Sequence, residues 1–182
     1  MKNALGMIET MSIPLGIFAA DAMLKAAGVD LVTSQAVCAG KYIVVVEGEV
    51  SSVRSSVEAG KEAAGSTLVD SLVIAGIHEQ VAPAINAAGE IEKVEALGVM
   101  ESYSLCAAVT ASDAAVKAAP VQLVEVRLGR GLGGKAFVLF TGEVAAVESA
   151  VRAAEAVEEI QGMLGASVII PSPHKKIAEA IL

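Results

Sequence analysis

Apolar and polar residues follow two different periods along the first half of the chain, and these periods predict strands and helices. Runs rich in β-branched and other apolar residues predict strands at Asn3–Glu9, Val29–Val37, Tyr42–Val46 and Leu68–Ile74. A helix is predicted from Ser12 or Pro14 to Ala27, a second helix follows Gly48 with valines at helical spacing, and a short third one covers His78–Ile85. The predicted order is therefore β-α-β-β-α-β, followed by a small helix.

The second half of the chain repeats the first. Residues Ala4–Glu9 (ALGMIE) recur as Ala96–Glu101 (ALGVME) at an offset of 92, which becomes 94 where Gly40-Lys41 matches Gly134-Lys135. The second copy therefore has two extra residues in the loop before that point. We expect a first domain at 1–86, a linker at 87–95 and a second domain at 96–182. Each would be a ferredoxin-like α/β (α+β) domain, with helices on one side of a sheet.

Composition narrows the class of protein. Hydrophobic residues are 54% of the 182 residues and the mean hydropathy is +0.64, which raises the question of a membrane protein. The longest uncharged run, 160–173, is too short for a spanning helix and contains two prolines, so we expect no membrane span and no signal peptide. The net charge of −8 argues against nucleic acid as a partner. Two cysteines without an export signal favour the reducing cytoplasm.

Both copies carry the same series of short motifs. The first copy has Ala4–Thr10, Asp21–Ala27 and a Gly-Lys strand leading to Gly48–Val50; the second repeats them from Ala96 and closes with Pro171–His174. In these motifs the chain resembles the bacterial microcompartment shell proteins, in the subclass with two tandem BMC domains. The resemblance implies a pseudo-hexameric homotrimer, a flat tile that packs beside other shell proteins in a microcompartment shell in the cytoplasm. It implies a structural protein rather than an enzyme.

The resemblance also implies that the loops at 34–40 and 127–134 face the threefold axis of the trimer. The first loop contains Cys38. One cysteine cannot hold an iron–sulfur cluster, which usually takes four thiolates, but three copies around the axis bring three thiolates together. Tandem shell proteins of the propanediol-utilisation type share the Cys-x-Gly-Lys loop and bind a [4Fe–4S] cluster there. By that resemblance, Cys38 is the expected ligand of one cluster per trimer, with one iron left to water or a small ligand.

Neighbouring residues extend this hypothesis. Val37, Ala39 and Gly40 would offer backbone N–H groups to the cluster. Arg130, which aligns near Cys38, would offset the negative charge of the cluster or remain solvated. The predicted role is electron transfer across the shell or cluster delivery to an enclosed redox enzyme. One alternative is a tile with a metabolite pore and no cluster, and a second is a ferredoxin-like ligand-binding regulator.

Other candidate residues receive structural interpretations. Cys106 aligns with a helix start away from the axis, which favours packing over metal ligation. His78 and His174 occupy equivalent positions in the two copies, so we expect a shared role in helix capping or in an interface. Lys25 and Lys117 match the lysine that lies at the tile edge in shell proteins; the alternative is an exposed helix lysine.

Overall fold

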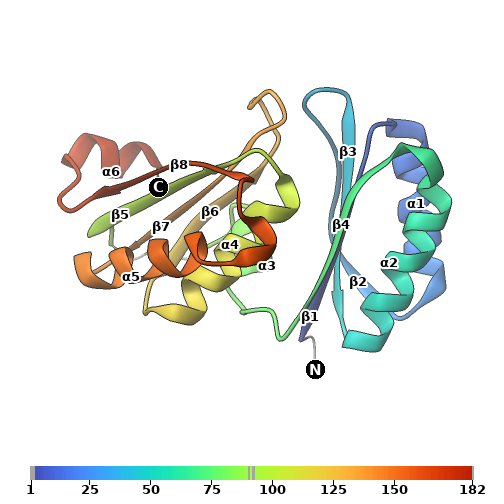
Figure 1. Ribbon diagram of the computed structural model, residues 1–182, viewed down its shortest axis with the longest axis horizontal. Helices are drawn as coiled ribbons and strands as arrows, with labels where there is room; N and C mark the ends of the chain where they lie inside the picture. The colour runs from blue at the N-terminus through green and yellow to red at the C-terminus, as the bar shows by residue number, and fades with distance from the viewer. Residues whose placement is uncertain (1–2, 90, 92, 182) are drawn as a thin grey trace. The chain divides into compact units, whose positions relative to one another are not determined.

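The computed structural model describes residues 3–89, 91 and 93–181, which form two structural units (Figure 1). Unit 1 extends to Ile77 and also contains the loop Gly129–Gly133. Unit 2 comprises His78–Leu128 and the chain from Gly134 onward. The units therefore divide the chain differently from the repeat. The segment 78–86, placed in the first domain from the sequence, lies with unit 2, where it makes its hydrogen bonds.

Unit 1 is a four-stranded antiparallel sheet with the strand order β2-β3-β1-β4. Two helices, α1 and α2, pack against each other and against the sheet. The elements are β1 (Ala4–Thr10), α1 (Ile13–Ala26), β2 (Val29–Val37), β3 (Lys41–Gly48), α2 (Val50–Ala64), a 3-10 turn at Gly65–Thr67 and β4 (Leu68–Ala75).

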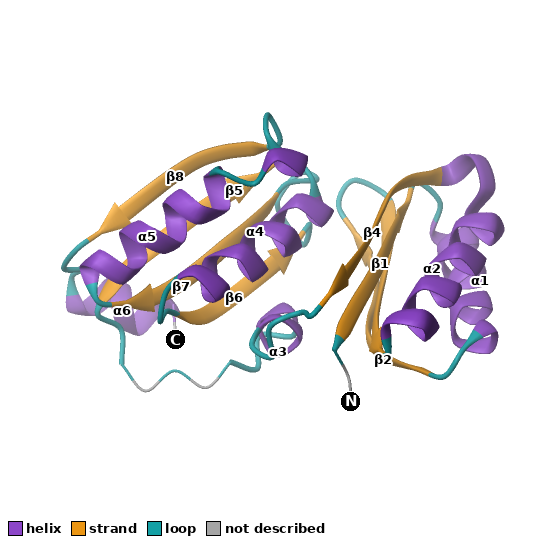
Figure 2. Ribbon diagram, turned by 60° about the horizontal axis from the view of Figure 1, so that its bottom comes forward, coloured by secondary structure: helices purple, strands orange, loops and turns teal. Residues whose placement is uncertain are grey.

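Unit 2 has the same topology, with the strand order β6-β7-β5-β8. Helices α4 and α5 lie across one face of its sheet (Figure 2). The elements are α3 (Val81–Ile85), β5 (Ala96–Ser102), α4 (Leu105–Ala118), β6 (Gln122–Leu128), β7 (Ala136–Gly142), α5 (Val144–Glu155), a 3-10 turn at Glu158–Ile160, β8 (Leu164–Ile170) and α6 (Lys175–Ile181).

The predicted β-α-β-β-α-β order and its repetition are confirmed. Two details of the prediction differ from the structure. The short helix starts at Val81 rather than His78, because His78 to Gln80 form a turn in which the His78 carbonyl accepts the Val81 N–H. Only three residues of the loop expected at 34–40 lie outside the strands, because β2 ends at Val37, where the predicted strand also ends. In the same way β6 continues to Leu128, so the second loop begins at Gly129.

The glycine of the repeated Ala-Leu-Gly motif has a packing reason in each unit. A β-carbon on Gly6 would lie 2.6 Å from Val57 Cγ2 and 2.7 Å from Val53 Cγ1, so glycine lets α2 approach β1. A β-carbon on Gly98 would lie 2.3 Å from Phe140 Cε2. Helix starts also agree with the sequence, since Ser12 and Ser104 each cap a helix by accepting a backbone N–H. No helix in the described ranges is both long enough and apolar enough to span a bilayer.

Candidate functional site

Cys38 lies at the tip of the hairpin formed by β2 and β3. Val37 and Lys41 are the last paired residues of the two strands, so Cys38, Ala39 and Gly40 form the turn. Gly40 has a φ of 77°, a left-handed conformation that glycine adopts without a β-carbon clash. The peptide bond between Cys38 and Ala39 is cis. Ala39 and Gly40 are exposed and Cys38 is half-buried, so the hairpin presents one partly accessible thiol at its end.

A second loop, Gly129–Gly133, contacts this turn. The backbone N–H of Cys38 donates to the carbonyl oxygen of Gly129 at 3.1 Å, and the N–H of Gly131 donates to Cys38 Sγ at 3.2 Å. Gly129, Gly131 and Gly133 all have positive φ values, which explains the glycine-rich sequence. The two-residue insertion of the second repeat falls in this loop. The insertion therefore belongs to the segment that supplies both hydrogen-bond partners of Cys38.

The Gly131–Cys38 contact gives the sulfur a hydrogen-bond donor. The thiolate is the form of cysteine that binds metals, and hydrogen bonds to a ligating sulfur tune the bound metal. The donor is Gly131, which lies 93 residues away in the chain. No local pattern around Cys38 could have identified it. The backbone N–H groups of Val37, Ala39 and Gly40, expected from the sequence to face a bound cluster, stay a prediction.

An ion pair holds the base of the Cys38 hairpin. Lys41 Nζ lies 2.6 Å from Glu9 Oε1, and the Glu9 side chain is only 2% exposed. The equivalent pair in unit 2 joins Lys135 to Glu101 at 3.2 Å, with both side chains more than 40% exposed. Lys135 also lies over the Tyr103 ring, 5.7 Å from its centroid. Each loop is therefore anchored by the lysine that follows it, but only the Cys38 hairpin is anchored by a buried carboxylate.

The other residues considered for the cluster site differ in their exposure to solvent. Val37 is buried at the end of β2, and Arg130 is exposed beside Gly131 at the loop tip. Cys106 is buried on α4, as its interpretation as a packing residue requires. Among the described residues of one chain, no three His, Cys, Asp or Glu side chains converge on a possible metal position.

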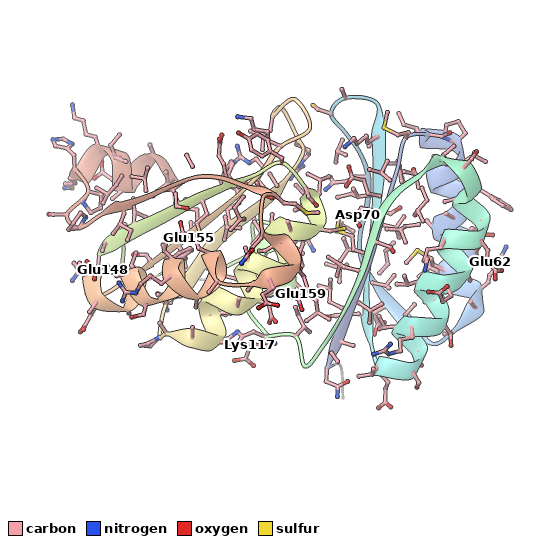
Figure 3. All side chains as sticks on the ribbon, in the orientation of Figure 1. Glu62, Asp70, Lys117, Glu148, Glu155 and Glu159 are labelled. Carbon is pink, nitrogen blue, oxygen red and sulfur yellow. The ribbon has the colours of Figure 1, made fainter. Side chains whose placement is uncertain are left out.

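Lys25 and Lys117, the two lysines expected at the tile edge, each pair with an aspartate one helical turn earlier. Lys25 Nζ contacts Asp21 Oδ2 at 2.5 Å on an exposed part of α1. Lys117, labelled in Figure 3, pairs with Asp113, whose side chain is 9% exposed and also accepts the backbone N–H of His78 at 2.8 Å. Asp113 is a structural residue that sequence reasoning did not single out. Its match with Asp21 in the repeat was the available signal.

His78 and His174 have the same local role. In each case the Nδ1 atom accepts the backbone N–H of the residue two positions later, Gln80 at 3.3 Å and Lys176 at 3.2 Å. The two histidines therefore share one local hydrogen bond: His174 directly precedes α6, whereas the His78 bond lies in the turn before α3, whose N-cap residue is Gln80.

Unit 2 also has a cavity of about 740 Å³. It lies on the face of the sheet opposite α4 and α5, because its lining residues alternate with those that face the helices. Its floor is apolar and includes Leu97, Val124 and Leu139. The charged Arg127 at its edge makes two hydrogen bonds to Glu125, at 2.6 and 2.8 Å, and lies over Phe137. The cavity is thus a mainly apolar sheet face with paired charges at its rim.

Comparison with known proteins identifies the family. The family model described as "BMC domain" matches residues 4–77 and 96–173, which cover both repeats. The chain belongs to the BMC-domain family of microcompartment shell proteins. It is 40% identical to the bacterial microcompartment shell protein PduT of Citrobacter freundii over 177 residues, 97% of this chain and 96% of that protein. A crystal structure of a microcompartment protein from Desulfitobacterium hafniense DCB matches with a TM-score of 0.93 and 46% identity, covering 98% of this chain and 99% of that one.

Single-domain shell proteins are also similar to this chain. The carboxysome shell protein CcmK2 of Synechococcus elongatus is 44% identical over 85 residues, which is 44% of this chain and 83% of CcmK2. This shell protein therefore carries two copies of a domain that its relatives also use singly. The relatives are structural shell proteins, in accord with the expected structural role and the expected location in a microcompartment shell.

Proposed function

We propose that three copies of this shell protein form a homotrimeric tile with one [4Fe–4S] cluster at the threefold axis, ligated by Cys38 of each copy. When bound, the cluster would supply one-electron redox chemistry, so that electrons cross the shell to or from an enclosed redox enzyme. The observation that carries this proposal is the position of Cys38, whose thiol ends the β2–β3 hairpin and accepts the N–H of Gly131.

The donor set of the chain fits this group when copies combine. Each copy offers one partly accessible thiol in a turn, and Cys106 is buried in a helix. Three Cys38 thiolates would hold three irons of a cubic cluster and leave the fourth to water or a small ligand. The N–H of Gly131 would remain as a hydrogen-bond donor to each ligating sulfur, an interaction that tunes metal-bound thiolates.

Other residues of the chain would hold and balance this site. The Glu9–Lys41 pair would fix the base of the hairpin, so that the thiol keeps its position when a second or third copy approaches. Arg130, exposed beside Gly131, would bring three positive charges near the axis. Those charges would oppose the negative charge of a thiolate-ligated cluster. Ala39 and Gly40 would add backbone groups at the tip.

Two surfaces of the chain support association of copies. Helix α1 exposes large apolar side chains, among them Ile17, Phe18 and Leu24. Unit 2 has the apolar sheet face described above. Exposed apolar patches of this kind mark interaction sites in soluble proteins. Because the two surfaces differ, contact between them would be head-to-tail, and head-to-tail contacts generate closed rings when the rotation permits. Lys25 and Lys117 would then lie at the outer edges, where the tile meets other shell proteins.

Anaerobic purification followed by iron and sulfide analysis tests the proposal. We expect broad visible absorbance, about four iron and four sulfide ions per trimer, and a trimer mass by light scattering. Cys38→Ser should remove the absorbance and leave the trimer intact, whereas Cys106→Ala should change neither. A colourless trimer without iron after reconstitution would exclude the cluster and favour the open metabolite pore. A monomer that fails to assemble with other shell proteins would favour the ligand-binding regulator.

A further inference from the structure

Each repeat ends in a short tail with the same pattern. The first tail, His78–Ile85, reads His-Glu-Gln-Val-Ala-Pro-Ala-Ile, and the second, His174–Ile181, reads His-Lys-Lys-Ile-Ala-Glu-Ala-Ile at a constant offset of 96. The shared positions are the histidine and the four apolar residues that follow at helical spacing. Because the Nδ1 atom of each histidine accepts the backbone N–H two residues later, the two tails are equivalent elements of the repeat.

The first tail is bound within unit 2. The backbone N–H of His78 donates to Asp113 Oδ1 on α4 at 2.8 Å. The Gln80 side chain spans the outer edge of the sheet: its Oε1 accepts the Leu123 N–H at 2.8 Å, and its Nε2 donates to the Val121 carbonyl at 3.3 Å. The apolar residues Val81, Ala84 and Ile85 of α3 are all buried. Helix α4 and the start of β6 therefore form a binding site for the first tail.

The equivalent site on unit 1 is exposed. At the offset of 92, Asp113 corresponds to Asp21, and Leu123 corresponds to Leu31. The Asp21 side chain is 55% exposed against 9% for Asp113. Leu31 is 47% exposed against 2% for Leu123. Unit 1 therefore presents, on α1 and β2, the same elements that bind a tail on unit 2.

The second tail is exposed where the first is buried. Ile177, which corresponds to the fully buried Val81, is 51% exposed, and no described residue of α6 is buried. Ile177, Ala180 and Ile181 line the apolar cavity of their own unit, and Ile181 packs against the apolar cluster there, but none of the three is buried. The chain thus contains one tail buried in its site, one tail that stays largely exposed and one exposed site of the first type.

We infer that the second tail of one copy binds the α1–β2 site of a second copy, with the His174 N–H donating to the Asp21 carboxylate as His78 does to Asp113. The partner is a second copy of this chain, so the inference rests on the proposed homotrimer and names a contact that holds it together. The charges of the equivalent residues support this partner. In unit 2, Gln80 bonds to the backbone on both sides of Gln122. In the second tail Gln80 is replaced by Lys176, and on unit 1 Gln122 is replaced by the exposed Asp30, so the two side chains that would meet have opposite charges.

An engineered disulfide tests the contact. In a Cys38→Ser, Cys106→Ala background, Asp21→Cys with His174→Cys should give covalent dimers and trimers on non-reducing gels. The matched control, Asp113→Cys with His78→Cys, should bridge within one chain and leave the mass unchanged, because the structure already places these residues in contact. We therefore expect disulfide-linked dimers and trimers from the 21/174 pair and only monomers from the 78/113 pair. A bridge that joins positions 21 and 174 of a single chain would overturn the inference.

A charge exchange gives an independent result if the cysteine pairs do not bridge. Lys176→Glu and Asp30→Lys should each weaken the trimer, so that the protein concentration at which half of it dissociates, measured by mass photometry, rises by about fivefold. The double variant should restore the original concentration. Lys93→Glu, which alters the net charge equally in the linker, should have no effect. Trimers that persist unchanged in both single variants would refute the tail contact while leaving the proposed function standing. Absence of trimers in the unmodified protein would refute the proposed function itself.

Discussion

The buried ion pair below the Cys38 hairpin can be tested with an internal control. Glu9→Gln keeps the shape of the side chain and removes its negative charge. Lys41 would then lose its ionic partner in a place where its side chain is only 20% exposed. The repeat supplies the comparison, because Glu101→Gln makes the same change beside Lys135, where both side chains are largely solvated.

The structure indicates how large the difference should be. Removing one partner of a fully buried pair costs about 3–5 kcal/mol. Lys41 keeps some contact with water, and glutamine can still accept its hydrogen bond, which recovers about 1 kcal/mol, so we expect a loss of about 2 kcal/mol for Glu9→Gln. An exposed pair contributes about 0–1 kcal/mol, which sets the expectation for Glu101→Gln. For a chain of this length, about 2 kcal/mol corresponds to a Tm lower by about 4–8 °C.

Differential scanning calorimetry at one fixed protein concentration measures both variants, because Tm depends on concentration in an oligomer. The Tm of Glu9→Gln should lie about 4–8 °C below that of the unmodified protein, and the Tm of Glu101→Gln should lie within about 4 °C of it. Hydrogen exchange should also show faster exchange at the Cys38 turn in Glu9→Gln alone. Equal Tm shifts in the two variants would refute the reasoning, because burial would then not decide the contribution of the pair.

Three further changes test other contacts. Gly98→Ala should destabilise unit 2 by about 1–3 kcal/mol in calorimetry because its β-carbon would overlap the Phe140 ring, whereas Gly28→Ala, with nothing within 4 Å, should not. Ser104→Ala should lower the free energy of unfolding by about 1 kcal/mol through loss of the α4 cap, and an unchanged denaturation midpoint would contradict that role. Deleting Arg130 and Gly131 should shift the midpoint potential of a bound cluster by tens of millivolts, measured by redox titration, because each thiolate loses one N–H donor.

The sequence predicted those parts of the fold that local patterns encode. The strand runs and the helix start at Ser12 depend on neighbouring residues, and the structure shows the predicted topology in both repeats. The glycine of the Ala-Leu-Gly motif was visible, but its reason was not. Only the structure shows that Gly6 and Gly98 make room for different side chains, valines of α2 in one unit and Phe140 in the other.

Contacts between distant segments could not be predicted in the same way. The sequence singled out Cys38, but its donor Gly131 belongs to a loop that was expected only to face the threefold axis. Asp113 was visible only as part of a helix motif, although it binds both Lys117 and the His78 backbone. Repeats help here, because a contact found once in the structure predicts its counterpart. That reasoning leads from Asp113 and His78 to Asp21 and His174.

Because two domains are joined in one chain, their equivalent loops can differ in sequence, which is not possible in a ring of identical single-domain shell proteins. In a ring of identical domains every axial loop has the same sequence, so a cysteine would appear in all of them. Here the loops differ: one has Cys38 in a three-residue turn, and the other is glycine-rich, with the insertion that lets Gly131 reach the sulfur. On the proposed trimer this arrangement places three thiols and three donor loops around one axis. The division of roles requires that both loops be kept together, so exchanging the second loop for a copy of the shorter first one with serine in place of its cysteine should impair the site even though Cys38 is untouched.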